Sequence, residues 1–183
     1  NPLFQLGEES AESDSLWNYE FGYKTTLADG RVILNSSVFF IDWSDMQVNQ
    51  TGFSPILGAE STYVDNGGDG EILGIELEFA GQVTDSLQVG ANFGYSDSEL
   101  TSSDADGVIG AQLPNVPETT ASVYAEYRRQ ISVIGEGFLR FDAQYTDKQA
   151  SRLITSTVDG FYLDEYTIGN VRAGVDGESW GAT

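Results

Sequence analysis

Apolar and polar residues alternate along several long segments of this chain, and this alternation constrains the fold more than any other feature. In residues 17–27, WNYEFGYKTTL, the side chains of Trp17, Tyr19, Phe21 and Tyr23 share one face. Asparagine, glutamate, glycine and lysine occupy the opposite face. A period of two is typical of a β-strand whose faces meet different surroundings. The chain is therefore predicted to be all-β.

Segments with this strand pattern are joined by connections that alternate between short and long. The predicted strands are residues 17–27, 31–43, 71–83, 87–96, 118–130, 138–149 and 165–176. Short turns are predicted at Ala28-Asp29-Gly30, at Thr84-Asp85-Ser86 and near residues 132–137. Asp-Gly is a strong signal for a tight hairpin. Longer polar stretches, expected to be irregular, lie at about residues 44–62, 97–117 and 150–163.

Strand length and loop asymmetry together favour a transmembrane β-barrel. The predicted strands are about 10 to 13 residues long, whereas strands of globular sheets usually have about 5 to 6. A tilted strand needs about 9 to 11 residues to cross a bilayer. Short turns at one end and long loops at the other are typical of an outer-membrane barrel, with lipid outside and a polar lumen inside. A soluble β-sandwich also alternates, but packs its apolar face inward.

The stretch YVDNGGDGEILGIELEF, residues 63–79, has two possible interpretations. Asp65, Asp69 and Glu71 lie among glycines, as carboxylates of a calcium loop do. Their spacing differs from that of an EF-hand, and the following residues have the period of a strand. A glycine-rich bend leading into a strand is therefore favoured. In that strand Leu73, Ile75, Leu77 and Phe79 point one way, and Gly74, Glu76 and Glu78 point the other.

Composition excludes several classes of function. The chain has 29 acidic and 8 basic residues, a formal net charge of -21, so nucleic acid is not an expected partner. It has no cysteine and no histidine, which excludes disulfides, thiolate or imidazole zinc sites and Ser-His-Asp or Cys-His catalysis. We predict no catalytic, cofactor-binding or metal-binding residue and no cofactor. The chain contains no run of about 18 apolar residues, so no transmembrane helix is predicted.

Several motifs resemble the barrel of TonB-dependent outer-membrane receptors. The segment WNYEFGYKTTLADGRVILNSSVFFIDWSDMQV is similar to a family hairpin that reads N-Y-E-x-G-x-K, a short turn, then F-Y-x-x-D-W/Y-x-D-x-Q-V. The matching residues are Asn18, Tyr19, Glu20, Gly22, Lys24, Phe39, Asp42, Trp43, Asp45, Gln47 and Val48. Asn66, Gly67, Gly74, Glu76 and Glu78 match a second family pattern, and Leu113, Pro114 and Pro117 match a third.

This resemblance spans nearly the whole chain and implies its place in a larger protein. Residues 1–183 would be a fragment containing about seven strands of a 22-stranded barrel, the size found in outer-membrane transporters. The N-terminal plug domain, the TonB box and the last two strands would lie outside it. The starting stretch NPLFQLGEES, with no initiator methionine, agrees with a fragment. Ile75 would face lipid, and Glu76 and Glu78 would face the lumen.

The resemblance also implies a function that needs no covalent chemistry. The protein would be a transporter of the Gram-negative outer membrane, not an enzyme, and would import a scarce nutrient such as a ferric siderophore. Expected partners are outer-membrane lipid, lipopolysaccharide, the ferric chelate, and TonB through the missing N-terminal region. A passive porin and a soluble carbohydrate-binding β-sandwich are the alternatives. Glu76 and Glu78 cannot be assigned as a glycosidase pair from spacing alone.

Acidic residues gather in the predicted loops. They could attract cations or cationic chelates, or they could simply be solvated and bridged to lipopolysaccharide by divalent ions. These residues are Glu60, Asp65, Asp97, Asp104, Asp106, Asp159 and Asp164. Tryptophan and tyrosine side chains could stack on a ligand, although their positions are more typical of an interfacial girdle. The substrate-binding residues are therefore left unassigned.

Overall fold

The computed structural model describes residues 11–54, 58–103, 108–132, 135–151 and 161–177. No helix among these residues is long and apolar enough to cross a bilayer. The strands are β1 (Ser15–Leu27), β2 (Val32–Ser44), β3 (Gln47–Ser54), β4 (Ala59–Asn66), β5 (Asp69–Thr84), β6 (Leu87–Ser102), β7 (Thr119–Ser132), β8 (Gly135–Thr146), β9 (Gln149–Ala150), β10 (Tyr162–Leu163) and β11 (Tyr166–Asp176).

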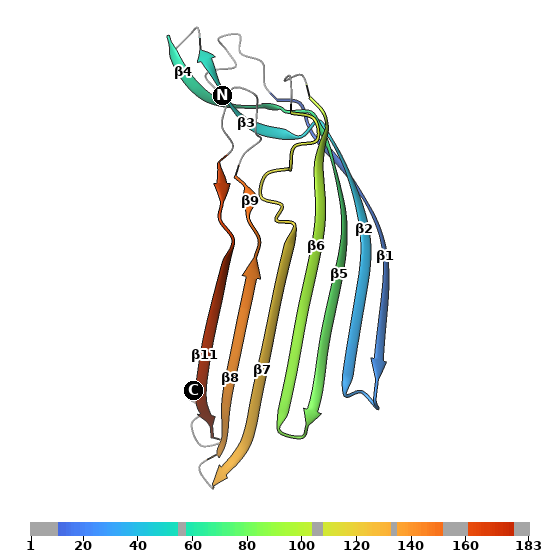
Figure 1. Cartoon of the computed structure of the whole chain (residues 1–183), viewed down its shortest axis with the longest axis vertical. Helices are drawn as coiled ribbons and strands as arrows, with labels where there is room; N and C mark the ends of the chain where they lie inside the picture. The colour runs from blue at the N-terminus through green and yellow to red at the C-terminus, as the bar shows by residue number, and fades with distance from the viewer. Residues whose placement is uncertain (1–10, 55–57, 104–107, 133–134, 152–160, 178–183) are drawn as a thin grey trace.

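Seven long strands form one antiparallel sheet in the order β1-β2-β5-β6-β7-β8-β11 (Figure 1). Each strand pairs with the next long strand along the chain, which is the meander expected of a barrel wall. Figure 1 shows the short turns together at one end of the sheet and the long connections, including β3 and β4, at the other. The predicted all-β fold with seven wall strands is confirmed, and the wall is open at β1 and β11.

The first short turn has the geometry that its sequence predicts. Asp29 and Gly30 are its central residues with positive φ, 55° and 89°, and Ala28 before them also has positive φ, 52°. Arg31 donates its backbone N–H to the carbonyl of Ala28 across the turn, at 3.1 Å. Positive φ at both central positions is the requirement of a type I′ hairpin, whose twist matches that of the flanking strands. The turn therefore fixes the register in which β1 pairs with β2.

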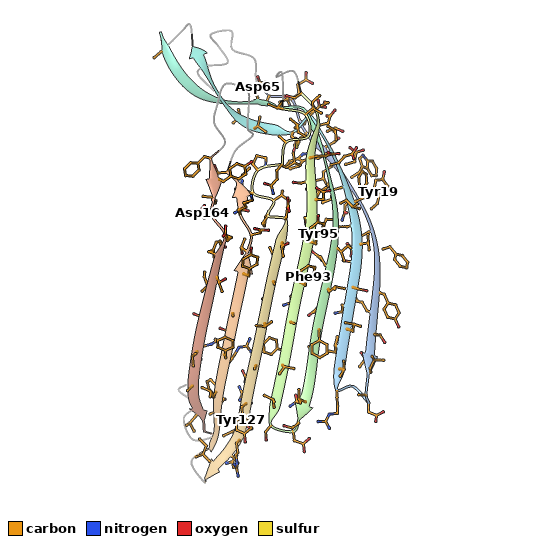
Figure 2. All side chains as sticks on the ribbon, viewed as in Figure 1. Tyr19, Asp65, Phe93, Tyr95, Tyr127 and Asp164 are labelled. Atoms are coloured by element: carbon orange, nitrogen blue, oxygen red, sulfur yellow. The ribbon has the colours of Figure 1, made fainter. Side chains whose placement is uncertain are left out.

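The apolar face of the sheet is exposed along the whole wall. Phe21 on β1 is 80% exposed, Leu73 on β5 is 54% exposed and Val171 on β11 is 69% exposed. A sandwich would bury these side chains against a second sheet. No second layer covers them in the described part of the chain, so the sandwich interpretation is wrong. Side chains project from the whole height of the wall in Figure 2.

The bend before β5 is closed by backbone hydrogen bonds. Met46 donates its N–H to the carbonyl of Gly68 at 2.8 Å, and Gly67 donates to the carbonyl of Met46 at 2.7 Å. Gly68 has a φ of 115°, and a Cβ there would lie 1.8 Å from the carbonyl oxygen of Ser102. Only glycine fits this position. The predicted glycine-rich bend is therefore confirmed.

Two predicted boundaries near the long connections were wrong. Residues 44–62, expected to be irregular, contain most of the β3–β4 hairpin, which projects beyond the end of the wall (Figure 1). β6 continues to Ser102 rather than ending at residue 96. The outward Asp97 and Glu99 break the apolar pattern without breaking the strand, because they still pair with β5.

The last long strands also begin and end at different residues from those predicted. β8 spans Gly135–Thr146 rather than 138–149, because the chain leaves the wall at Asp147 and then pairs in the small β9–β10 sheet. The preceding turn is correspondingly shorter than 132–137. Residues 133–134, like 152–160 of the predicted polar loop, lie outside the described residues.

Candidate functional site

The polar face of the sheet carries a hollow of about 520 Å³ at mid-height. Glu20 and Lys24 of β1, Glu76 and Glu78 of β5 and Gln144 of β8 line it. The strand register places these residues opposite the exposed apolar side chains, as the alternation predicted. The hollow is therefore a water-accessible surface that offers carboxylates, amides and hydroxyl groups.

One side of this hollow keeps carboxylates that no cation neutralises. Asn35 donates its Nδ2–H to Oε2 of Glu78 at 2.7 Å, and Asn92 donates to Oγ of Ser122 at 3.1 Å. The side-chain carboxylates of Glu20 and Glu76 make no hydrogen bond or ion pair with any residue in the described part of the chain. The hollow is consequently negative on the β1–β5 side.

Aromatic rings lie flat on glycines at the polar face. A Cβ on Gly74 would lie 2.2 Å from Cζ of Phe39, its partner across the β2–β5 pair. A Cβ on Gly90 would lie 2.2 Å from Cε1 of Tyr124 across the β6–β7 pair. The glycines leave space that the rings occupy, an arrangement known to compensate for glycine in strands.

Charged residues join the strands on the β7–β11 side. Arg128 donates Nε–H to Glu126 at 2.5 Å, and its Nη1 lies 2.9 Å from a carboxylate oxygen of Asp176 and 3.3 Å from one of Glu136. Its guanidinium carbon also lies 5.2 Å from the ring centre of Phe138. One arginine therefore links β7, β8 and β11.

A second arginine extends this network of arginines and carboxylates on β7, β8 and β11, which we call the charge ladder. Arg140 donates Nε–H to Asp142 at 2.9 Å, and its Nη1 lies 3.4 Å from Glu126. Arg172 on β11 bonds the same Asp142 oxygen at 3.1 Å. The Arg140 guanidinium carbon lies 4.4 Å from the ring centre of Tyr124. On this side three arginines pair with four carboxylates, in contrast to the β1–β5 side.

A compact apolar cluster covers the polar face near its loop end. Its buried members are Met46, Ile72, Leu100, Val108 and Leu113. Leu100 and Leu113 are the largest fully buried side chains of the described residues, at 0% and 1% exposure. The five cluster residues come from β5, β6 and the two connections that follow β2 and β6. The cluster therefore anchors these connections to the wall.

The Leu113 segment, residues 108–118, runs beside the upper part of β6, where β7 does not reach. Leu100 donates its N–H to the carbonyl of Ala111 at 2.9 Å, and Gly110 donates to the carbonyl of Leu100 at 2.8 Å. The N–H of Leu113 lies 3.2 Å from Oγ of Ser98. These bonds satisfy the exposed edge of β6. The Leu113 segment is thus fixed against the wall beside the hollow.

This segment is also tied to the next long connection. Asn115 donates its backbone N–H to the carbonyl of Ala150 at 2.8 Å. Asp147 donates its N–H to the carbonyl of Thr119 at 2.9 Å, where β7 and β8 meet the loops. The bases of the two connections are therefore fastened together.

The predicted acidic loop residues do not converge on one point. Asp65 lies at the end of β4, and Asp164 lies between β10 and β11, on opposite sides of the loop end in Figure 2. Asp97 is on β6, and Glu60 is on β4. Asp104, Asp106 and Asp159 lie outside the described residues.

The carboxylates of the glycine-rich bend are engaged in structural hydrogen bonds. Asp69 accepts the backbone N–H of Asp45 at 3.0 Å and the hydroxyl of Ser102 at 2.8 Å. These bonds hold the pKa of Asp69, which lies beyond the apolar band at the loop end, below its ordinary value. Asp65 accepts the N–H of Asn66 at 2.9 Å. Within the described ranges, no group of three or more potential ligands could hold a metal ion.

The charge ladder was not predicted, although the sequence contains a signal for it. Opposite charges stand two residues apart at Glu126 and Arg128, and again at Arg140 and Asp142. Residues two apart share one face of a strand. Pairing these two strands in antiparallel register would have placed the four side chains together.

The fold and its two chemically different faces can now be compared with known proteins. The family model for the TonB dependent receptor-like β-barrel matches residues 15–182. The chain belongs to the TonB-dependent receptor family. This family consists of receptors and transporters of the Gram-negative outer membrane and is not a family of enzymes. In the family's terms, the seven-stranded sheet is barrel wall and its polar face is lumenal.

Two curated relatives cover most of the chain at low identity. The probable TonB-dependent siderophore receptor PiuA of Acinetobacter baumannii is 27% identical over 170 residues, which are 86% of this chain and 21% of the relative. The metal-pseudopaline receptor CntO of Pseudomonas aeruginosa is 26% identical over 152 residues, or 81% of this chain and 20% of the relative. The chain thus spans about a fifth of the length of these relatives.

Solved structures show the same fold. The ferric yersiniabactin uptake receptor FyuA of Yersinia pestis superimposes with a TM-score of 0.70 at 18% identity, covering 88% of this chain and 22% of that structure. The siderophore receptor PiuA of A. baumannii gives a TM-score of 0.63 at 23% identity, covering 88% and 22%. The receptor wall is therefore the shared element.

Proposed function

We propose that this chain is part of the barrel wall of an outer-membrane receptor that imports a ferric siderophore with energy supplied through TonB. The match of residues 15–182 to the family model is the observation that carries this proposal. The relatives named above support the cargo class, since one is a probable siderophore receptor and the other a metal-pseudopaline receptor.

The geometry of the wall suits this role. Its long strands have an exposed apolar face for lipid and a polar face for a wet interior. In outer-membrane barrels the long loops face the exterior and the short turns face the periplasm. The Leu113 segment then lies at the outer mouth, above the hollow. The chain's role is to hold and pass the ligand, for which no covalent step is required.

The remaining parts of the receptor would lie in the same protein outside this chain. We propose that an N-terminal plug domain, a TonB box and further strands accompany the seven strands described here. The further strands would pair with the open edges at β1 and β11, which otherwise expose unpaired backbone groups. The plug and TonB box distinguish this receptor from a passive porin.

The proposal predicts uptake that depends on both this protein and TonB. Deleting the gene that encodes the chain should abolish growth on, and uptake of, at least one ferric siderophore as the sole iron source. Inactivating TonB in the parent strain should abolish the same uptake. The measurement is accumulation of radioactive iron from a panel of purified ferric siderophores. Uptake lost on gene deletion but retained without TonB would favour the passive porin instead.

A further inference from the structure

A groove of about 560 Å³ lies on the lipid-facing side of the wall, near the short-turn end of β7, β8 and β11. Tyr127, Arg129 and Ile131 of β7 line one side. Leu139 of β8 and Val175 of β11 also line the groove. Figure 2 shows Tyr127 low on the wall, close to the short turns. The groove is therefore near the expected periplasmic surface of the membrane.

Small residues create this depression. Gly137 pairs with both Arg129 and Val175, so the middle strand has no side chain at that level. A Cβ there would lie 1.9 Å from Cδ1 of Ile131, which shows that the Ile131 side chain lies across the glycine. Ala173 continues the low surface one row closer to the membrane centre, where it pairs with Leu139. The result is an apolar channel that ends at Arg129.

Arg129 differs from the other arginines of these strands. Arg128, Arg140 and Arg172 lie on the lumenal face, and each has a carboxylate partner. The Arg129 side chain is exposed on the apolar face, and its guanidinium makes no ion pair or hydrogen bond with any residue that the structure describes. An unpaired cation on a lipid-facing surface is unfavourable unless it reaches water or an anion.

We propose that this groove binds an anionic phospholipid of the periplasmic leaflet. The phosphate pairs with Arg129, whose planar guanidinium suits phosphate oxygens. One acyl chain lies in the channel over Gly137 and Ala173, beside Leu139. The inference rests on the proposed outer-membrane function, because that function orients the short turns toward the periplasm. Charge complementarity selects an anionic headgroup over a zwitterionic one.

The test compares lipid retention by the whole receptor and by three variants. Receptor extracted from outer membranes is titrated with palmitoyl-oleoyl phosphatidylglycerol, and bound lipid is counted by native mass spectrometry. Arg129→Gln removes the cation. Ala173→Leu fills the channel while preserving the apolar face. Arg31→Gln is the matched control, because Arg31 lies at the same end of the wall but bonds the carbonyl of Gln82. Phosphatidylcholine serves as the zwitterionic comparison lipid.

Wild type and Arg31→Gln are expected to bind one phosphatidylglycerol more tightly than either groove variant does. Arg129→Gln should weaken its binding by about fivefold, the factor expected for one cation beside anionic lipid. Equal retention by all four proteins, or equal retention of phosphatidylcholine, overturns the site. Ferric-siderophore binding by the same samples should be unchanged in the groove variants. A wild-type receptor that bound no ferric siderophore would count against the transport proposal. Lipid retention is scored independently of that result.

Discussion

At the residue scale, the smoothness of the lumenal wall depends on aromatic rings lying over glycines. The Phe39 ring occupies the space above Gly74, and the Tyr124 ring occupies the space above Gly90. The guanidinium carbon of Arg140 lies 4.4 Å from the centre of the Tyr124 ring. Adding a methyl group to either glycine would therefore displace its ring. At Gly90 it would also displace Arg140, which contacts the Tyr124 ring.

Gly74→Ala is expected to destabilise the folded wall by about 1 to 3 kcal/mol, because overpacking forces the Phe39 ring aside. Urea unfolding of the receptor in lipid vesicles measures this loss. Gly22→Ala is the control, since a Cβ at Gly22 meets its nearest neighbour at an ordinary 3.5 Å. If Phe39→Leu failed to relieve the effect of Gly74→Ala, ring displacement would not be its cause.

Changes of charge on the two faces of β5 should destabilise the receptor to very different extents. Ile75 is 43% exposed on the lipid-facing side, so Ile75→Arg should cost about 2 to 4 kcal/mol near the membrane midplane. Glu76→Gln removes a carboxylate from the polar hollow and should cost much less. The two variants are compared by the amount of folded receptor in the outer membrane, which is measured from heat-modifiable gel mobility. Similar losses from both substitutions would contradict the register of β5.

The sequence allowed most residues to be assigned correctly to a face, but not all inward apolar residues. Trp17 and Phe21 follow the period of two and are exposed on the lipid side. Phe39, Phe40 and Ile41 are consecutive, which obscures the period. Phe39 and Ile41 pack against the apolar cluster. That cluster needs the distant Leu113 segment, a contact that local periodicity cannot indicate.

At the scale of elements, strand order and hairpin pairing were predictable, whereas strand ends beyond the membrane were not. Within the bilayer one face must be apolar, so the sequence carries a strong periodic signal. Above it, the outward face is polar too, and β6 continues through Asp97 and Glu99 with no such signal. The β3–β4 hairpin also lies beyond the wall and was not predicted. The groove on the lipid-facing side depends on small residues from neighbouring strands. It could not be predicted without the register in which those strands pair.

The Leu113 segment should be held to the wall by one side chain. Leu113→Ala removes a 1% exposed residue from the apolar cluster and should cost about 2 to 5 kcal/mol. Amide hydrogen exchange at Leu100 and Gly110 should accelerate, because their bonds join the segment to β6. Ile109→Ala, at a 68% exposed position of the same segment, should leave exchange unchanged. Unchanged exchange in Leu113→Ala would show that backbone bonds alone suffice.

At the scale of the whole molecule, the described wall is incomplete as a soluble body. It has an exposed apolar face, and β1 and β11 each present an unpaired edge. Exposed apolar patches and open edges both promote association. The charged side chains of β7, β8 and β11 lie on the lumenal face and therefore do not cover the apolar one. The wall by itself therefore has no cover for its apolar face or for its two edges.

A polypeptide containing only residues 11–177 is accordingly expected to aggregate when refolded in detergent-free buffer. Light scattering and size-exclusion chromatography measure the association. The whole receptor refolded into lipid vesicles is the control and should give a monodisperse, heat-modifiable species. A soluble monomer of the isolated piece with strand-rich circular dichroism would mean that its apolar face is covered in some other way.

The bond from Asn115 to Ala150 has a consequence for how such a receptor can diversify over generations. Two loops that share a fastening at their bases cannot be remodelled independently there. An insertion beside either residue would disturb both loops, whereas an insertion farther out would leave the fastening intact. New ligand specificities should therefore arise by exchange of loop tips, while paired changes at the bases should be inherited together.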